Sequence, residues 1–507
     1  MTGAPSSGEH ERRLATNYLV RQAAQVAGIV VGLGVTTLLA RRLSLSELGV
    51  YALLLSLTSY LIVLQAVIEP SAIKAIAEAR DQADRDRAFS TTLVVYSAAG
   101  IVGAVVVLAL GAIFLQIWSI PADLHADAWR GVVALAVMTL LSWPTRAFYD
   151  VLRGEQLFPL AAVTEVLALL ISSAAVAVLV LLDASLWLIV LAVATGSLIL
   201  GSSSAAIIEA KGLPYRFRRT ALTRAGTRDF LSLSGYYFLA GVADIVIYSL
   251  DRTILGAFRS ARSVGLYEGP ARAHNLVRDV QATLVSPVLP AAARFRAEGD
   301  AERLRELLLR GSKYLVAVVT SVGLTFVVLG RPLLVAWLGV KFAPAAVALS
   351  ILVGYWIVYA NTSVGWNMLV AIGQIRKFAL FAGAVAVLNL ALSLALTPIL
   401  GLNGVVLGTA IPYVLGIPVF LRLTLPEFGV RVREFAREVW LPAYSTAFAV
   451  GGAVAAVRFS VDLETIPLSL SASVAAVLGY WTLYYAVWLR PSERTLVHDL
   501  VRQLMRR

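Results

Sequence analysis

Long apolar runs, separated by short polar turns, restrict the possible folds of this chain more than any other feature. A helix needs about 20 apolar residues to cross the hydrocarbon core of a bilayer. Hydrophobic residues make up 59% of the 507 residues and charged residues only 15%, whereas soluble domains are about 45–50% apolar and about 25% charged. We therefore predict an all-α polytopic membrane protein with about 14 transmembrane helices. Their approximate bounds are 16–40, 48–70, 89–117, 129–152, 157–182, 186–209, 228–256, 264–290, 311–336, 344–370, 378–398, 404–423, 438–457 and 468–489.

The Lys and Arg residues fall mainly in alternate turns between these runs. Turns rich in Lys and Arg stay on the cytoplasmic side of a membrane. The turns after even-numbered spans contain Lys74, Arg80, Arg85, Arg87, Lys211, Arg216, Arg218, Arg219, Arg294, Arg296, Arg303, Arg376, Lys377, Arg422 and Arg431. This asymmetry predicts a multi-pass protein of the plasma (cytoplasmic or inner) membrane with both termini in the cytoplasm.

The sequence contains an internal repeat. ELGVYAL (47–53), near the start of span two, matches SVGLYEG (263–269), near the start of span eight, so that Gly49 and Tyr51 correspond to Gly265 and Tyr267. A basic turn follows span two and span eight alike. We therefore predict two six-helix lobes around a central cavity near the bilayer midplane, followed by two extra C-terminal helices. The predicted parts are a cytoplasmic tail (1–15), an N-lobe (16–215), a C-lobe (216–427), spans thirteen and fourteen (428–490) and a cytoplasmic amphipathic tail (491–507).

Three predicted spans carry polar residues at helical spacing. An ionisable side chain inside a span costs about 2.5–3.5 kcal/mol on insertion scales, so such residues usually face a wet interior. Residues at this spacing share one helix face, and we expect the three faces to line the cavity. They are Asn17, Arg21 and Gln25 in span one, Asp244, Tyr248, Asp251 and Arg252 in span seven, and Glu268, Arg272, Asn275 and Asp279 in span eight.

Three segments resemble one family of transporters. The run from Asn17 to Leu53, with N-x3-R-Q and LLARRLSLSELGVYAL, resembles the opening of Wzx-type polysaccharide flippases of the multidrug/oligosaccharidyl-lipid/polysaccharide (MOP) exporter superfamily. DRTILGAFRSARSVGLYEGPARAHN (251–275) is similar to that family's junction between spans seven and eight, and LALTPILGLNGVVLGTAI (394–411) is similar to its turn between spans eleven and twelve.

The resemblance implies an alternating-access flippase of the cell membrane. Its substrate would be a polyprenyl-pyrophosphate-linked oligosaccharide, moved from the cytoplasmic to the external leaflet for O-antigen, capsule or exopolysaccharide biosynthesis, with or without a coupled H⁺ or Na⁺. A lipid II flippase and a cation-coupled drug antiporter of the same superfamily remain alternatives. Expected partners are the lipid-linked substrate, membrane lipid and other polysaccharide-assembly proteins, but no nucleic acid.

The polar residues suit such a substrate. Arginine bonds phosphate oxygens through a planar, two-pronged group, so Arg272 and Arg21 are candidate pyrophosphate contacts. Asp244, at mid-span, is the candidate ion-coupling residue. The remaining candidate substrate-binding residues are Asn17, Gln25, Asp251, Arg252, Glu268 and Asn275, and Glu69 and Glu165 are further candidate lining residues. An alternative reading makes Glu268 and Arg272 a stabilising i,i+4 pair.

Several classes of function are disfavoured. The chain has no cysteine and four scattered histidines, so we expect no metal site, cofactor or thiol chemistry. It lacks the GxxxxGK[ST] motif that cradles nucleotide phosphates. The predicted outer turns are too short to hold the catalytic domain of a membrane ligase or glycosyltransferase, and a scaffold has no need of charges inside the membrane. We predict a transporter and not an enzyme.

Overall fold

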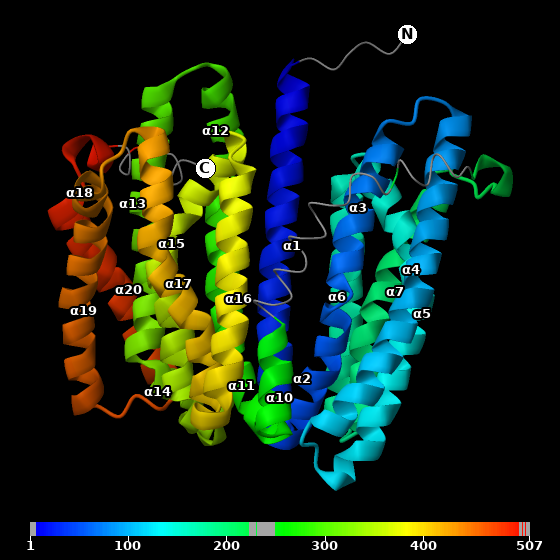
Figure 1. The fold of residues 1–507 in the computed structure, drawn as a ribbon, viewed down its shortest axis with the longest axis horizontal. Helices are drawn as coiled ribbons and strands as arrows, with labels where there is room; N and C mark the ends of the chain where they lie inside the picture. The colour runs from blue at the N-terminus through cyan, green and yellow to red at the C-terminus, as the bar shows by residue number, and fades with distance from the viewer. Residues whose placement is uncertain (1–6, 223–229, 231–248, 496–498, 500–501, 503–507) are drawn as a thin grey trace. The chain divides into compact units, whose positions relative to one another are not determined.

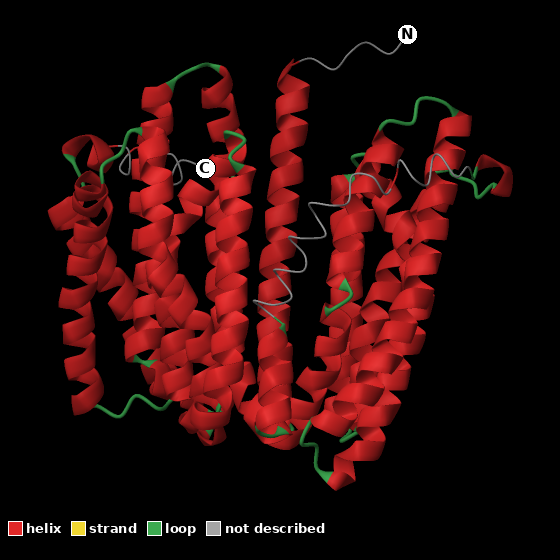
Figure 2. Ribbon diagram, viewed as in Figure 1, coloured by secondary structure: helices red, strands yellow, loops and turns green. Residues whose placement is uncertain are grey.

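A computed structural model describes residues 7–222, 230, 249–495, 499 and 502. Within this part of the chain the regular elements are all helices, as Figures 1 and 2 show. The longer ones are α1 (Ser7–Arg42), α2 (Leu45–Ser59), α3 (Ile62–Ala77), α4 (Gln82–Ile117), α5 (His125–Gly154), α6 (Phe158–Leu181), α7 (Leu186–Ala210), α10 (Leu250–Phe258), α11 (Ala261–Val285), α12 (Val288–Ala297), α13 (Ala301–Val328), α14 (Gly330–Leu338), α15 (Ala346–Ala371), α16 (Ile375–Leu400), α17 (Leu402–Thr424), α19 (Leu441–Ser460) and α20 (Ile466–Trp488).

Ten helical segments of the described chain are long and apolar enough to cross a membrane. The pair α2 and α3, bent by 42° at a short break, makes an eleventh if it is counted as one span. The all-α membrane fold is thereby confirmed, whereas the number fourteen stays a prediction. Predicted span seven falls largely on residues outside the described ones, and α11 is too rich in charged residues to pass the same test.

Three predicted spans are broken where one continuous helix was expected. Predicted span two corresponds to α2 and α3, span eight to α11 and α12, and span nine to α13 and α14. The last two breaks lie beside Pro287 and Pro332, and proline cannot donate the backbone hydrogen bond that continues a helix. Apolar run length alone does not reveal such breaks.

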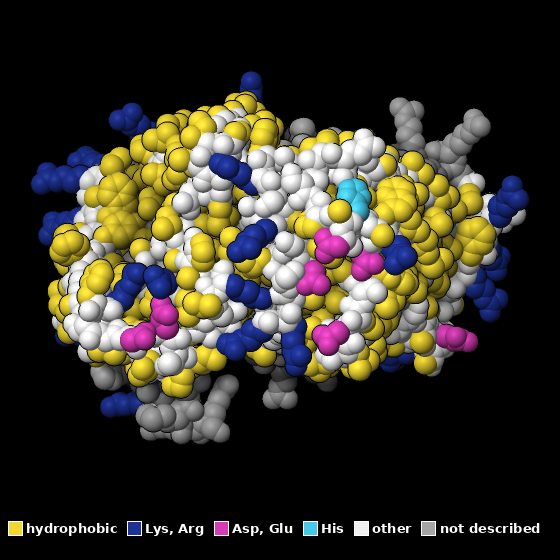
Figure 3. All heavy atoms as spheres, turned by 90° about the horizontal axis from the view of Figure 1, so that it is seen from below, with side chains coloured by type: hydrophobic (Ala, Val, Ile, Leu, Met, Phe, Trp, Pro, Cys, Tyr) yellow, Lys and Arg dark blue, Asp and Glu magenta, His cyan; other side chains and the backbone are white. Residues whose placement is uncertain are grey.

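The outward-facing surface of these helices is strongly apolar. Large hydrophobic side chains are exposed along α4, α6, α16 and α20, for example Val105, Leu170, Val387 and Leu478. Figure 3 shows yellow hydrophobic side chains over wide parts of one face, with charged side chains interspersed. In water such patches would be unfavourable, but lipid accommodates them.

The chain divides into two compact units, Met1–Gly265 and Leu266–Arg507. In the first unit α5 packs along α4 and α7, while α6 packs against α7 and α1. In the second unit α13 packs against α15, α19 and α20, and α17 packs against α15 and α16. The predicted domain bounds, with the lobes meeting at 215/216, stay a prediction.

The predicted repeat is visible in local structure. Helix α2 begins after Ser44, whose hydroxyl accepts a hydrogen bond from the backbone N–H of Glu47 (3.2 Å). Helix α11 begins after Ser260, whose hydroxyl accepts from the backbone N–H of Ser263 (3.3 Å). The two caps and the two helix starts are separated by the same 216 positions as the matched glycines. Serine caps at repeat-related positions indicate two copies of one structural motif.

The matched glycines also make reciprocal contacts. A Cβ atom on Gly49 would collide with the carbonyl oxygen of Ala261, and one on Gly265 would collide with that of Leu45. The start of α11, up to Gly265, belongs to the first unit. The two helices therefore touch backbone to backbone there, an approach that only glycine permits.

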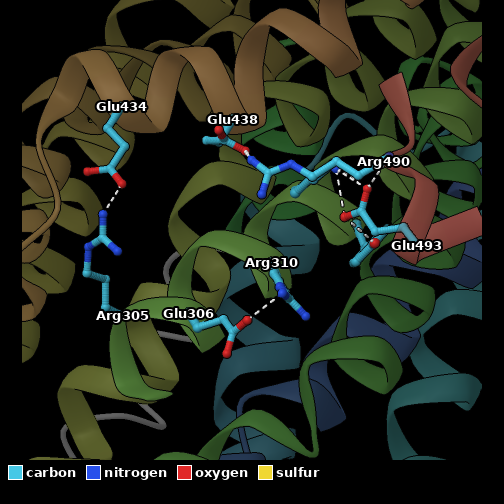
Figure 4. Close-up of polar contacts among 9 residues, drawn as sticks. Arg305, Glu306, Arg310, Glu434, Glu438, Arg490 and Glu493 are labelled. Carbon is cyan, nitrogen blue, oxygen red and sulfur yellow. Dashed lines mark hydrogen bonds and ion pairs between the residues drawn. The ribbon is translucent and has the colours of Figure 1, made fainter. Parts of the chain in front are cut away.

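A network of polar contacts holds the C-terminal segment to the second unit (Figure 4). Glu493 accepts hydrogen bonds from the Lys313 ammonium (2.9 Å) and the Tyr314 hydroxyl (2.7 Å) on α13. Arg490 pairs with Glu438 at 2.6 Å. The predicted amphipathic tail lies mostly outside the described residues, but its first turn is fixed by these contacts.

Candidate functional site

The structure describes only some of the predicted site residues. Asp244 and Tyr248 lie outside the described residues. Asn17, Arg21 and Gln25 lie on α1, but their side chains are not among those described. Their proposed roles therefore remain predictions from the sequence.

Span eight carries the predicted polar face. On α11, the side chains of Glu268, Arg272, Asn275 and Asp279 are all half-buried, whereas Ala273 and Val277 between them are buried. Helical spacing therefore places the polar residues on one stripe, as predicted. Asp279 forms an ion pair with its neighbour Arg278 at 3.3 Å.

Asp251 and Arg252 lie at the start of α10. The Asp251 side chain is buried and that of Arg252 is half-buried. The next residue, Thr253, shares a short hydroxyl–hydroxyl contact with Tyr60 at the end of α2. These residues thus lie in a packed region of the first unit and are not at a freely exposed helix end.

The first unit contains a cluster of charged residues that the sequence analysis largely missed. Arg146, Asp150 and Arg153 follow i, i+4, i+7 spacing on α5, inside an apolar span. The Arg153 guanidinium makes a short ion pair with Glu69 on α3, and Glu69 also accepts a hydrogen bond from Gln65 (2.9 Å). Sequence reasoning named Glu69 as a candidate lining residue but not its partner.

Two tyrosines complete this cluster. The Tyr96 hydroxyl on α4 donates to the Asp150 carboxylate at 2.7 Å, and both side chains are buried. The Tyr149 hydroxyl donates to Glu165 on α6 through a short contact. The three carboxylates of the cluster, from α3, α5 and α6, each therefore have a polar partner. The same i, i+4, i+7 spacing that identified α11 could have revealed Arg146, Asp150 and Arg153.

Arg146 differs from its neighbours on α5. It is half-buried about two turns before the end of the helix. No carboxylate of the described chain lies within ion-pair distance of it, although Glu69 and Asp150 lie near enough to interact with it electrostatically. A cation inside a membrane span is costly and normally pairs with another group or serves a pathway. In the described part of unit one, the Arg146 guanidinium is thus suited to bind an anionic ligand.

The second unit contains, besides the charged stripe of α11, a buried group of neutral and aromatic side chains. The indole N–H of Trp356 on α15 donates to Nδ1 of His274 on α11 at 3.1 Å, and the Tyr355 hydroxyl lies 3.4 Å from the same nitrogen. Tyr355 stacks on Tyr413 of α17, with ring centroids 5.3 Å apart. The sequence analysis did not select His274, because a single histidine in an apolar context carries no spacing signal.

No metal centre is evident in the described chain. Groups of three or more His, Cys, Asp or Glu side chains placed to hold a metal ion do not occur among its residues. The polar groups of the two units are thus paired charges with Arg146 beside them in unit one, and a histidine–aromatic group in unit two.

The bundle of long apolar helices with embedded charges defines a multi-pass membrane protein. The fold is that of MOP-superfamily transporters. It matches an inward-closed lipid II flippase MurJ with a TM-score of 0.75 and 14% identity, over 92% of this chain and 99% of that one. It also matches an inward-facing multidrug resistance MATE family transporter of the MOP superfamily with a TM-score of 0.68 and 17% identity, over 79% of this chain and 94% of that one.

The sequence adds the family. Residues 14–296 match the model of the family described as polysaccharide biosynthesis protein, and the chain belongs to that family. No curated protein matches the chain significantly. The predicted resemblance to a polysaccharide family is thereby confirmed, and the two structural neighbours named above, a lipid II flippase and a multidrug transporter, share the fold of this chain.

Proposed function

We propose that this protein is a flippase for polyprenyl-pyrophosphate-linked oligosaccharide, moving it from the cytoplasmic to the external leaflet during polysaccharide assembly. The observation that carries the proposal is Arg146, a half-buried cation of α5 without an ion pair in the described part of this polysaccharide biosynthesis family member. Guanidinium groups bind phosphate oxygens in bidentate fashion. A pyrophosphate headgroup is thus a fitting ligand inside the membrane.

The residues predicted from the sequence take the following parts in this proposal. Arg272 and Arg21 are pyrophosphate contacts in this proposal, and Arg146 is a further one in the first unit. Asp244 binds the coupled H⁺ or Na⁺. The sugar units meet the polar side chains of Asn17, Gln25, Asp251, Arg252, Glu268 and Asn275. The protein lies in the plasma membrane with both ends in the cytoplasm, where it receives substrate from other polysaccharide-assembly proteins.

A second candidate substrate is lipid II, another polyprenyl-pyrophosphate-linked saccharide. The match to a lipid II flippase over 99% of that chain favours keeping it. The two candidates share the headgroup and differ in the sugars. A cation-coupled drug antiporter is the remaining alternative, supported by the match to a multidrug transporter.

The test is translocation in proteoliposomes of a fluorescent polyprenyl-pyrophosphate oligosaccharide, with lipid II and a cationic drug as competing substrates. We expect wild type to translocate the oligosaccharide and Arg146→Gln and Arg272→Ala to lose at least tenfold in rate. Arg272→Lys should recover only part, because an ammonium lacks the planar fork. Arg130→Gln is the matched control, since Arg130 is an exposed arginine of α5 that pairs with Asp127.

Two results would contradict the proposal. Normal translocation by both the Arg146→Gln and the Arg272→Ala variants would remove these arginines from headgroup binding. Transport of the drug with no movement of either lipid-linked saccharide would replace the flippase with the antiporter.

A further inference from the structure

His274 is a buried titratable side chain without a part in the proposed transport scheme. It lies in the middle of α11, with only 7% of its surface exposed. Its ring is enclosed by Tyr355 and Trp356 of α15, whose ring centroids lie 5.6 Å and 5.4 Å from that of the imidazole. All three residues belong to the second unit.

The hydrogen bond with Trp356 fixes the state of the imidazole. An indole nitrogen carries a hydrogen and can only donate, so Nδ1 of His274 must accept and cannot itself carry a proton. The ring is therefore neutral, with its hydrogen on Nε2. This assignment follows from the chemistry of the partner at 3.1 Å.

A proton added to Nδ1 would bring two donors face to face. The Trp356 contact would then be lost, because neither nitrogen could accept. The Tyr355 hydroxyl, 3.4 Å from Nδ1, offers an oxygen that can accept from the new N–H. The same surroundings thus suit both protonation states, but through different hydrogen bonds.

We propose that His274 is a proton-binding site that exchanges its Nδ1 hydrogen bond from Trp356 to Tyr355 when it takes up a proton. The proton comes from water, and the lone pair of Nδ1 binds it. Since Tyr355 stacks on Tyr413, the exchange alters packing between α11, α15 and α17. It does not depend on which substrate the protein carries.

Other titratable and charged groups surround this site. Tyr355 faces the ring from α15 and Tyr413 lies behind Tyr355 on α17, while Tyr359 packs against both Trp356 and Tyr413. On α11 itself, Arg278 lies one turn further along. Arg272 lies two residues before His274 on the same helix, so a movement of α11 would carry a proposed headgroup contact with it.

The direct test uses protein with ring-¹⁵N histidine in lipid nanodiscs. The chain has four histidines, and His274→Gln identifies the signal of interest. We expect NMR to show the Nε2–H tautomer at high pH and conversion to the doubly protonated ring between about pH 5 and 8. An Nδ1–H tautomer at high pH, or no titration in this range, would overturn the proposal.

Two variants give shifts of opposite sign. Trp356→Phe removes the donor that favours the neutral ring, so the midpoint of the His274 titration should rise. Tyr355→Phe removes the acceptor that favours the charged ring, so the midpoint should fall. Each shift should be about half to one pH unit, the size expected for one hydrogen bond. Shifts in the same direction, or none, would contradict the exchange.

The functional test compares translocation rates across the same pH range. His274→Gln keeps an acceptor for the indole but cannot titrate, so its rate should lose the pH dependence seen in wild type. His125→Gln, at an exposed histidine, is the matched control and should keep it. An unchanged pH profile in His274→Gln would overturn the site's part in transport, whereas failure of the proposed substrate would leave the NMR titration in place.

Discussion

The two units handle polar groups inside apolar helices in different ways. In the first, charges are brought together from separate helices, as in the ion pair between Glu69 and Arg153. In the second, the buried contacts of α15 are mostly between neutral groups, as between Trp356 and His274 or Gln281 and Ser363. A charge left without its partner is expensive, while a neutral donor can change partners at little cost. The first arrangement therefore favours rigidity and the second permits switching.

The largest effect is expected when one charge of the first unit is removed. Arg153→Leu leaves Glu69 half-buried, with the Gln65 amide as its remaining hydrogen-bond donor in the described chain. We expect a loss of about 3 kcal/mol in unfolding free energy, measured as a lower unfolding temperature in detergent. The double variant Glu69→Gln/Arg153→Leu should recover much of the loss. A double variant less stable than either single one would show that the pair is not the main interaction.

The α5 cluster also shows where sequence reasoning succeeded and failed. Predicted spans such as 157–182 and 186–209 agree within one residue with α6 and α7, because apolar length and flanking turns define a span. The charged residues of α5 lie inside such a span, and its overall apolar character hid them as candidate site residues. Their partners come from α3, α4 and α6, and pairing between helices far apart in sequence cannot be read from the spacing within one helix.

The internal repeat, in contrast, could be recognised from the sequence. Short motifs around Gly49 and Gly265 were enough to align the two copies, and the helix starts and serine caps follow the same offset. A serine cap is local, and the two glycines that touch stand in similar short motifs, so both features can be found from a few adjacent residues. His274 left no such signal, because its role depends on Trp356 and Tyr355, about eighty positions away.

The repeat gives a second prediction, on positions where the two copies should behave alike. Gly49→Ala and Gly265→Ala each place a methyl group against a backbone carbonyl of the other helix. Overpacking of this kind costs about 1–3 kcal/mol, so we expect about 2 kcal/mol for either variant. Gly28→Ala, where a Cβ meets nothing within 4 Å, should not destabilise. Losses that differ strongly between Gly49→Ala and Gly265→Ala would disprove the reciprocal contact.

A third prediction compares the charged pair of the first unit with a neutral hydrogen bond of the second. The Gln281 amide donates to the Ser363 hydroxyl at 2.7 Å, and both side chains are buried. Ser363→Ala should cost about 1 kcal/mol, the usual worth of a neutral hydrogen bond, and so clearly less than Arg153→Leu. Thermal unfolding of the two variants side by side gives the comparison. An equal loss of unfolding free energy in both variants would show that charged and neutral contacts contribute alike.

A fourth prediction, with an effect that fades in acid, concerns Glu493, which lies beyond the last membrane span of the second unit. Glu493 follows α20 and is held by Lys313, Tyr314 and the backbone N–H of Arg490 (Figure 4). Burial alone would raise the pKa of Glu493, but these hydrogen bonds and the nearby ammonium outweigh it and hold the pKa below its ordinary value of 4.5. The folded state therefore binds the proton less readily than the unfolded state.

This sign determines the pH dependence. A lowered folded-state pKa adds stability that is fully present above about pH 4.5 and disappears as the pH falls through the folded-state pKa. We expect Glu493→Gln to unfold at a lower temperature than wild type at neutral pH, by a loss of about 1 kcal/mol, and the difference to shrink in acid. Glu464→Gln is the control, because its partner Arg331 is exposed and exposed pairs contribute about 0–1 kcal/mol. A difference for Glu493→Gln that stays constant down to the lowest pH measured would mean that the carboxylate charge is not what holds the C-terminal segment to α13.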